Sequence, residues 1–169
     1  MYKVAIIDDE PLIVEGLSKT IAWDKWNCQV TGTAGDGKEG MELIREKRPD
    51  IVITDICMPK MDGLKMIAGL KSEFPEMQLI ILTGYREFEY ARQAIELGVA
   101  RFLLKPSKMN ELEEAIAAVT ARLDLTGLPA ASPEEVYEQA DGTGTVPETE
   151  DENGEANSFI VKNALEYIR

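Results

Sequence analysis

The sequence of 169 residues contains no histidine and only two cysteines. Without histidine, the chain lacks the most common general base and the most common transition-metal ligand of proteins. Cys28 and Cys57 are far apart and form no metal-type pair. Only four apolar residues separate Lys3 from Asp8, so no signal peptide is recognisable, and no run approaches the ~20 apolar residues of a membrane span. We therefore expect a cytoplasmic protein without a membrane partner.

Clustered positive charge is also scarce. The formal net charge is −13, of which residues 1–123 carry −4 and residues 124–169 carry −9. The excess acidity therefore lies in the C-terminal segment. Because no basic patch stands out, this chain alone is predicted to bind nucleic acid poorly.

Five short apolar segments alternate with amphipathic ones over residues 1–123. The strand-like segments are YKVAIID (2–8), CQVTGTA (28–34), DIVIT (50–54), QLIILT (78–83) and RFLLK (101–105). Helical periodicity covers residues 12–21, 41–47, 64–71, 88–95 and 112–123. Alternating strands and helices with short links predict an α/β fold, a doubly wound, five-stranded parallel sheet of (βα)5 type with a flavodoxin-like strand order.

The amino-acid composition changes after residue 123. Residues 124–157 are rich in Gly, Pro, Thr and acidic side chains, so we expect an acidic and largely disordered linker. Within it, SPEEVYEQ (132–139) is compatible with a short helix. Residues 158–169 carry an apolar stripe at helical spacing. Two interpretations remain open for this terminal helix: the start of a truncated output domain, or a helix that docks back on the first domain.

Chemically active residue types follow the predicted strands. Asp8 and Asp9 follow the first strand, Asp55 the third, Thr83 the fourth, and Lys105 ends the fifth. In a doubly wound sheet, function collects at the carboxyl ends of the strands. Three carboxylates that converge there would raise each other's pKa unless a cation compensates them. Mg²⁺ prefers oxygen ligands, so the acidic trio predicts a magnesium site.

Each of these residues also has an ordinary structural explanation. Asp8 or Asp9 could cap the helix that begins near Pro11. Thr83 alone is typical of a turn, and Lys105 alone of a solvated surface. The functional interpretation depends on all of them occurring together at the ends of four strands.

Four motifs carry a resemblance to a known family. They are DDEP at 8–11, TDICMPKMDG at 54–63, LTGY at 82–85 and FLLKP at 102–106. Their combination resembles the receiver domain of two-component response regulators, which has a CheY-like fold, over residues 2 to about 123. The resemblance implies that residues 1–123 form the receiver domain.

The resemblance assigns the acidic residues. Asp55 would be the phosphoacceptor. Asp9 would bind Mg²⁺ directly, Asp8 through water, and the backbone carbonyl of Cys57 would supply a further oxygen. Asp55 would complete this metal site.

The resemblance also assigns the remaining motif residues. Thr83 would bond the phosphoryl group and act as a switch together with Phe102. Lys105 would pair with a phosphoryl oxygen, and Pro106 would follow it through a cis bond. Gly63 would form the turn after the active-site loop. Cys57 and Tyr85 depart from frequent family choices. They would flank the path of the water that attacks the phosphorylated aspartate, and Tyr85 would shield it and so prolong the life of the phosphoryl group.

Partners follow from the same resemblance. The donor would be a phosphohistidine of a sensor histidine kinase, since this chain has no histidine. The domain would be no conventional enzyme, but would catalyse its own aspartyl phosphorylation and slow dephosphorylation. GYREFEYARQAIELGVARFLLKP (84–106) and FIVKNALEYIR (159–169) resemble AraC-type response regulators, so DNA would be bound only through an output domain missing here. On phosphorylation, a homodimer would form through the face of the fourth helix, fifth strand and fifth helix.

Three competing interpretations can be weighed from the sequence. A haloacid-dehalogenase-like phosphatase needs a second aspartate two residues after the first, where this chain has Cys57. A dinucleotide-binding domain needs a glycine-rich turn where this chain has DDEPLIVEG (8–16). The main alternative is a degenerate receiver, a protein-interaction module independent of phosphorylation.

Overall fold

The structure, a computed structural model, describes residues 1–126 of the chain. Its strands are β1 (Tyr2–Ile7), β2 (Cys28–Ala34), β3 (Ile51–Thr54), β4 (Gln78–Thr83) and β5 (Arg101–Leu104). Its α-helices are α1 (Pro11–Thr20), α2 (Gly37–Lys47), α3 (Gly63–Leu70), α4 (Phe88–Glu96) and α5 (Met109–Thr126). The predictions for residues 127–169 lie outside the described part.

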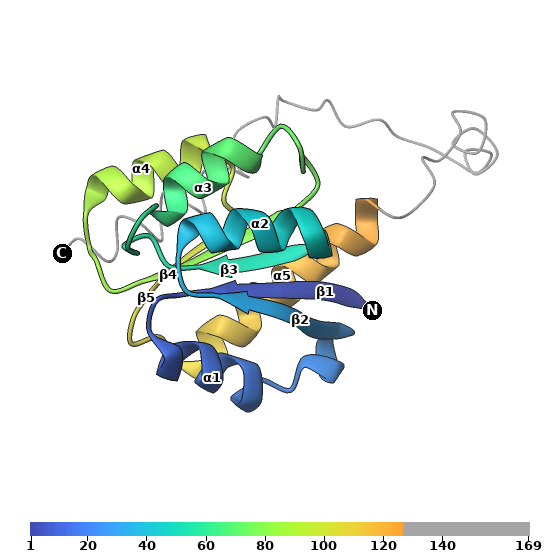
Figure 1. The fold of residues 1–169 in the computed structure, drawn as a ribbon. Coiled ribbons are helices and arrows are strands. Elements are labelled where there is room, and N and C mark those ends of the chain that lie inside the picture. Colours follow the sequence, from blue (N-terminus) through green and yellow to red (C-terminus); the bar gives the residue numbers. More distant parts are fainter. Residues whose placement is uncertain (127–169) are drawn as a thin grey trace, which may run out of the picture. The chain divides into compact units, whose positions relative to one another are not determined.

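The five strands form one parallel sheet in the order β2-β1-β3-β4-β5. Figure 1 shows α2, α3 and α4 on one face of this sheet and α1 and α5 on the other. The predicted flavodoxin-like fold, with its doubly wound parallel sheet, is therefore confirmed. In this order β1 and β3 are neighbours, which brings the segments after Ile7 and Thr54 together.

Burial explains why the central strands are almost purely apolar. All four residues of β3 are buried, as are the last four of β1 and the last five of β4. Helices cover both faces of the sheet, so consecutive side chains, which point to opposite faces, all enter the interior. Each fully buried isoleucine or leucine contributes about 1.5–3 kcal/mol to folding by removing its side chain from water.

Two local features differ from the sequence predictions. A short 3₁₀ helix, η1 (Trp23–Trp26), lies between α1 and β2 and ends at Asn27, which adopts a left-handed conformation with φ of 52°. Helix α5 continues through Thr126, so the first three residues of the predicted linker, 124–126, belong to this helix. Its buried stripe of Leu112, Ile116 and Val119 matches the predicted apolar face.

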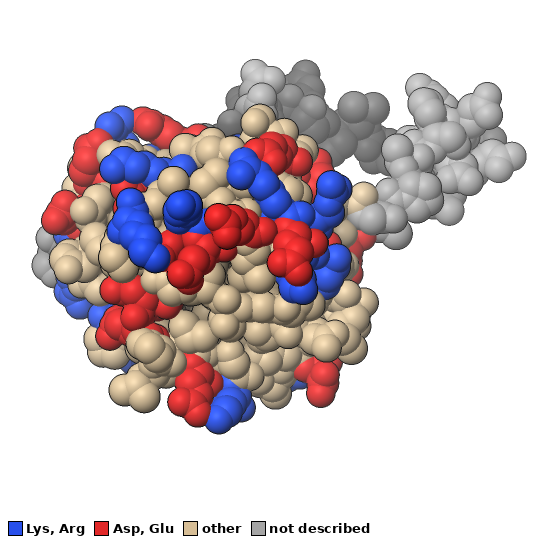
Figure 2. All heavy atoms as spheres, viewed as in Figure 1, with Lys and Arg blue, Asp and Glu red and all other residues tan. Residues whose placement is uncertain are grey.

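Acidic and basic side chains are interspersed on the surface of the described residues. Figure 2 shows red and blue groups side by side over α2 and α3. Arg45 on α2 pairs with Glu73 at 2.6 Å, and Lys65 pairs with Asp62 at 3.0 Å. On this face, basic side chains therefore lie next to acidic ones, and Arg45 and Lys65 are paired. Among the described helices, none is long and apolar enough to cross a membrane.

Candidate functional site

The backbone places two acidic residues at the carboxyl edge of the sheet. Asp8 follows β1, and its N–H donates to the carbonyl of Ala34 at the end of β2 (3.0 Å). Asp55 follows β3, and its N–H donates to the carbonyl of Ile7 (3.0 Å). The sheet's hydrogen bonding thus continues one residue past the strands and fixes both carboxylates at its edge.

The predicted convergence of three carboxylates is present. One carboxylate oxygen from each of Asp8, Asp9 and Asp55 lies within 4.8 Å of the other two. Asp8 and Asp55 are buried, whereas Asp9 is exposed. Two buried carboxylates so close together repel each other and lose hydration, so this arrangement needs compensating positive charge.

Lys105 supplies one positive charge from the end of β5. Its Nζ lies 2.7 Å from Asp8 Oδ2, 2.9 Å from Asp55 Oδ2 and 2.9 Å from Glu10 Oε1. The Lys105 N–H donates to the carbonyl of Thr83 (2.8 Å), which anchors the backbone to β4. The peptide bond between Lys105 and Pro106 is cis, as the resemblance implies.

The close approach of these charged groups shifts the pKa values of Asp8 and Lys105. Burial raises the pKa of Asp8 above its usual value, and the negative charge of Asp55 adds to that rise, although hydrogen bonds from Lys105 and the Glu10 amide oppose it. Burial alone would lower the pKa of Lys105, but its hydrogen bonds to Asp8, Asp55 and Glu10 outweigh that effect and raise the pKa well above the usual range. Lys105 is therefore firmly cationic.

The residues present fit a hard divalent cation. Asp8, Asp9, Glu10 and Asp55 carry four negative charges, and Lys105 returns one positive charge. The grouped donors are all carboxylate oxygens, the ligand type that Mg²⁺ prefers, and Asp9 is open to solvent, so water could supply the remaining ligands.

The capping explanation for the paired aspartates does not hold. The N-cap residue of α1 is Glu10, and no side chain caps this helix. Asp8 Oδ1 instead accepts a hydrogen bond from the Glu10 N–H (3.0 Å), which shapes the turn between β1 and α1.

The loop after Asp55 is closely packed. Asp55 Oδ1 accepts hydrogen bonds from the N–H groups of Ile56 (2.5 Å) and Cys57 (3.3 Å). The Gly63 N–H donates to the Ile56 carbonyl (2.8 Å), and a Cβ at position 63 would lie 2.0 Å from the Asp55 carbonyl oxygen. Only glycine allows this approach, so Gly63 holds the loop against the acidic site.

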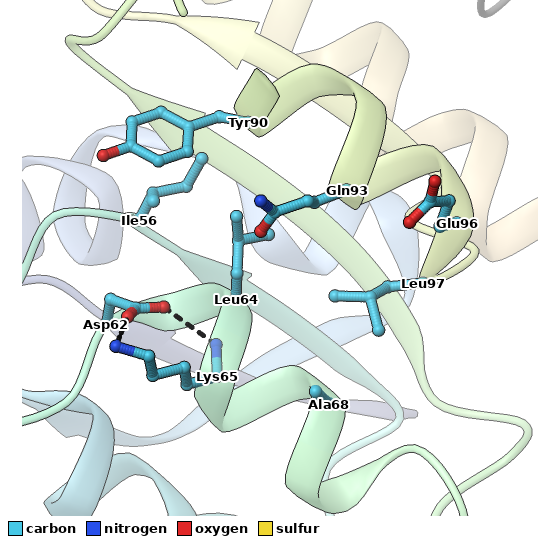
Figure 3. A pocket seen from close by; sticks show the side chains of 9 residues that line it. All are labelled: Ile56, Asp62, Leu64, Lys65, Ala68, Tyr90, Gln93, Glu96 and Leu97. Carbon is cyan, nitrogen blue, oxygen red and sulfur yellow. Dashed lines mark hydrogen bonds and ion pairs between the residues drawn. The ribbon is translucent and has the colours of Figure 1, made fainter. Parts of the chain in front are cut away.

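Cys57 connects this loop to α4. The Cys57 thiol donates to the Tyr90 hydroxyl oxygen across 3.7 Å, and this contact, with nearby negative charge, raises the pKa of Tyr90 to about 12. Tyr90 borders a cavity of about 450 Å³ between α3 and α4, whose apolar floor includes Ile56, Leu64 and Leu97 (Figure 3). The contact between Cys57 and Tyr90 thus links the loop after Asp55 to α4, and it lies beside this cavity.

The two predicted switch residues lie on neighbouring strands. Thr83, fully buried at the end of β4, accepts a hydrogen bond at Oγ1 from the Tyr85 N–H (3.4 Å). Phe102, on β5, pairs in register with Ile81 of β4 and packs, half-buried, against the core. Tyr85 itself is 51% exposed.

The sequence reasoning missed two sets of contacts. Glu10 belongs to the quoted DDEP motif, but its bond to Lys105 was not anticipated. Lys60 reaches the buried carboxylate of Asp36 at 2.6 Å and joins the loop after β3 to the start of α2. The only available signals were an extra acid beside Asp9 and an aspartate before the glycine that opens α2.

Comparison with known proteins adds an independent line of evidence. A profile of the response regulator receiver domain matches residues 4–117. The uncharacterized transcriptional regulatory protein YesN of Bacillus subtilis is 40% identical over 123 residues, which are 73% of this chain and 33% of YesN. The transcriptional regulatory protein HptR of Staphylococcus aureus is 37% identical over 123 residues, covering 73% of this chain and 48% of HptR. The chain thus spans about a third to a half of the length of these curated relatives.

Solved structures agree with the sequence relatives. The REC domain of AraT, a response regulator from Geobacillus stearothermophilus, superposes with a TM-score of 0.72 at 39% identity, covering 75% of this chain and 98% of that domain. A response regulator receiver domain protein from Clostridium thermocellum gives a TM-score of 0.67 at 31% identity, covering 75% and 99%.

Proposed function

Because this chain belongs to the response regulator receiver family, we propose that it accepts a phosphoryl group on Asp55 from a sensor histidine kinase and thereby switches a transcriptional output. The observation that carries the proposal is the buried Asp55 carboxylate, which bonds Lys105 at 2.9 Å and lies within 4.8 Å of the oxygens of Asp8 and Asp9. An aspartate in this setting is a nucleophile surrounded by groups that bind anions and cations.

The transfer step is a substitution at phosphorus. A carboxylate oxygen of Asp55 forms a bond to phosphorus while the bond from phosphorus to the donor's histidine nitrogen breaks. The nitrogen keeps that electron pair, and the donor side chain leaves as neutral imidazole because its other ring nitrogen carries a proton. Asp55 becomes an acyl phosphate. Charge spreads over three phosphoryl oxygens during transfer, and Lys105 is placed to stabilise it.

Asp9, Asp55 and the Cys57 carbonyl would hold Mg²⁺ directly, and Asp8 through water. When bound, Mg²⁺ neutralises charge on the phosphoryl oxygens. The chain's own contribution is to orient the nucleophile: the Ile56 and Cys57 amides hold one oxygen of Asp55, and Lys105 holds the other.

Thr83 and Phe102 would carry the signal away from Asp55. The Thr83 hydroxyl would turn toward the phosphoryl group, and Phe102 would move into the space this vacates, changing the surface around α4 and β5. The half-buried position of Phe102 supports this role, because its ring already reaches the protein surface.

Dimerisation through α4, β5 and α5 is proposed for the phosphorylated form. Arg86, Glu89, Arg92, Glu96 and Lys108 are the candidate cross-dimer charges on this face. In the structure, Arg92 bonds both Glu89 and Glu96 within α4, so these pairs would have to exchange partners. Sedimentation of the phosphorylated protein checks this, and a monomer at high concentration would contradict it.

The wider setting is proposed from the relatives. Two of them are transcriptional regulatory proteins of which this chain spans half or less. We therefore propose a transcriptional output outside the described residues, of the AraC type that residues 84–106 and 159–169 resemble. Residues 127–157 would form the linker, because residues 124–126 belong to α5, and residues 158–169 would form the first helix of that output. We place the protein in the cytoplasm, where its thiols, Cys28 and Cys57, remain reduced.

Intact mass after incubation with acetyl phosphate and Mg²⁺ tests the proposal. We expect the gain of one phosphoryl group, which is lost on adding EDTA beforehand and lost in Asp55→Asn. Asp50→Asn, another aspartate beside β3, is the matched control and should gain the group. No gain in the folded wild-type protein would instead favour the interaction module that works without phosphorylation.

A further inference from the structure

Three carboxylate oxygens already surround the Lys105 ammonium group, to which an incoming phosphoryl group would have to bind. An ammonium group carries three N–H donors. Two of them donate to Asp55 Oδ2 and Glu10 Oε1, each at 2.9 Å, and the ammonium group also forms an ion pair with Asp8 Oδ2 at 2.7 Å. A phosphoryl oxygen that approaches Lys105 before the transfer, while Asp55 is still a carboxylate, must therefore compete with these three carboxylates for the ammonium group.

The three carboxylates differ greatly in exposure. The side chains of Asp8 and Asp55 are 3% and 7% exposed, whereas that of Glu10 is 60% exposed. A buried carboxylate that loses its cation is left without water to replace it. An exposed one returns to solvent at little cost, because exposed ion pairs are weak. Glu10 is therefore the partner that Lys105 can release most easily.

The backbone directs Glu10 toward this contact. Glu10 occupies the N-cap position of α1, where a side chain could accept a hydrogen bond from the helix, but it makes no such bond. Its N–H is held by Asp8 Oδ1 (3.0 Å), and its carboxylate bonds Lys105 instead, 95 residues away in the sequence.

We propose that Glu10 is a positioning residue that occupies Lys105 in the unphosphorylated protein and is displaced by the phosphoryl group. This inference rests on the proposed function of Asp55. Glu10 opposes phosphorylation in two ways: it competes for the ammonium donor, and its negative charge at the exposed side of the site repels an anionic phosphodonor. It thereby sets how readily small or weakly docking donors phosphorylate Asp55.

Phosphorylation rates as a function of acetyl phosphate concentration test this role. Acetyl phosphate is used because it needs no kinase docking surface. We compare the wild-type protein with Glu10→Gln, which removes the charge, and Glu10→Ala, which removes charge and acceptor. Glu15→Gln on α1 is the matched control: it removes the same charge from a side chain that pairs with Lys19 and not with Lys105.

Both Glu10 variants should be phosphorylated roughly three- to tenfold faster at low donor concentration, as expected for removal of a repelling charge beside a site. The gain should come from a lower half-saturating donor concentration, with the maximal rate changed less than twofold, and should shrink at high salt. Beryllofluoride, with Mg²⁺, should also bind these variants more tightly. A merely structural role would instead lower the maximal rate.

The results distinguish the proposed role of Glu10 from the proposed phosphorylation of Asp55. If the wild-type protein is phosphorylated and the Glu10 variants are no faster, or if Glu15→Gln is accelerated equally, the role of Glu10 is wrong and that of Asp55 stands. If neither the wild-type protein nor any variant is phosphorylated, the proposed function itself fails.

Discussion

Two lysines join loops at the carboxyl edge of the sheet, and their surroundings differ. The rim cluster consists of Asp8, Asp9, Glu10, Asp55 and Lys105. The loop clasp consists of Asp36, Glu39 and Lys60. Lys105 is 13% exposed and faces three carboxylates within 3 Å, whereas Lys60 is 61% exposed and has one close partner, Asp36, with Glu39 at 3.6 Å.

The two clusters differ in how far their carboxylate charges are compensated by partners within the chain. In the loop clasp, Asp36 Oδ1 accepts the N–H groups of Lys38 and Glu39, and Oδ2 accepts Lys60, so the chain itself uses both oxygens. In the rim cluster, four carboxylates share one cation. A satisfied cluster stabilises the fold, whereas an undercompensated one favours binding of an external cation or a reaction that changes its charge.

The largest expected effect separates the two lysines. Lys105→Met should slow phosphorylation by acetyl phosphate about a hundredfold, the order seen when a group that stabilises transition-state charge is removed. Lys60→Met should change the rate less than about twofold, because its partner Asp36 belongs to the loop clasp. Intact-mass kinetics measures both, and equal losses would contradict the comparison.

Metal binding should separate the two clusters next. With Mg²⁺ at 100 times its dissociation constant, the wild-type fold should gain about 2.7 kcal/mol of unfolding free energy. Asp9→Asn should lose most of this gain. Asp36→Asn, the same change in the loop clasp, should keep it, although its melting temperature falls by several degrees in all conditions. Thermal unfolding with Mg²⁺ or EDTA measures the shifts, and an equal Mg²⁺ response in both variants would exclude the predicted site.

The smallest expected effect is the loss of the stabilising contribution of Asp36 at low pH. The hydrogen bond from Lys60, followed by that from the Glu39 amide, holds the pKa of Asp36 below its ordinary value of 3.8. A carboxyl group with a lowered folded pKa stabilises the fold above its unfolded pKa and loses that contribution as pH falls through the folded value.

Urea unfolding of the wild-type protein and Asp36→Asn from pH 7 to pH 3 measures this contribution. Their stability difference should be constant above about pH 5 and shrink below about pH 4. A difference that stays constant to pH 3 would show that the Lys60 contact adds nothing.

The fold and the meeting of the acids could be predicted because few signals decide them. The segments IVIT and QLIILT are strands too apolar to lie anywhere but the interior, and parallel strands bring Asp8 and Asp55 to one edge. The partners of Glu10 and Lys60 could not be predicted. Their side chains are long and solvated, and the choice among nearby opposite charges depends on distances that only the folded chain defines.

The register of β3 with its two neighbouring strands fixes the position of Asp55. Thr54 pairs with Ile7 on one side and Ile81 on the other, and Asp55 is the next residue. Because side chains alternate between faces, one residue inserted into β3 would have one of two effects. It would carry Asp55 beyond Lys105, or, if Asp55 kept its place, it would turn the apolar side chains before the insertion to the opposite helical layer. Length changes should therefore be tolerated far less in this four-residue strand than in the surface turns. The length of β3 is therefore as much a part of the proposed site as Asp55 itself.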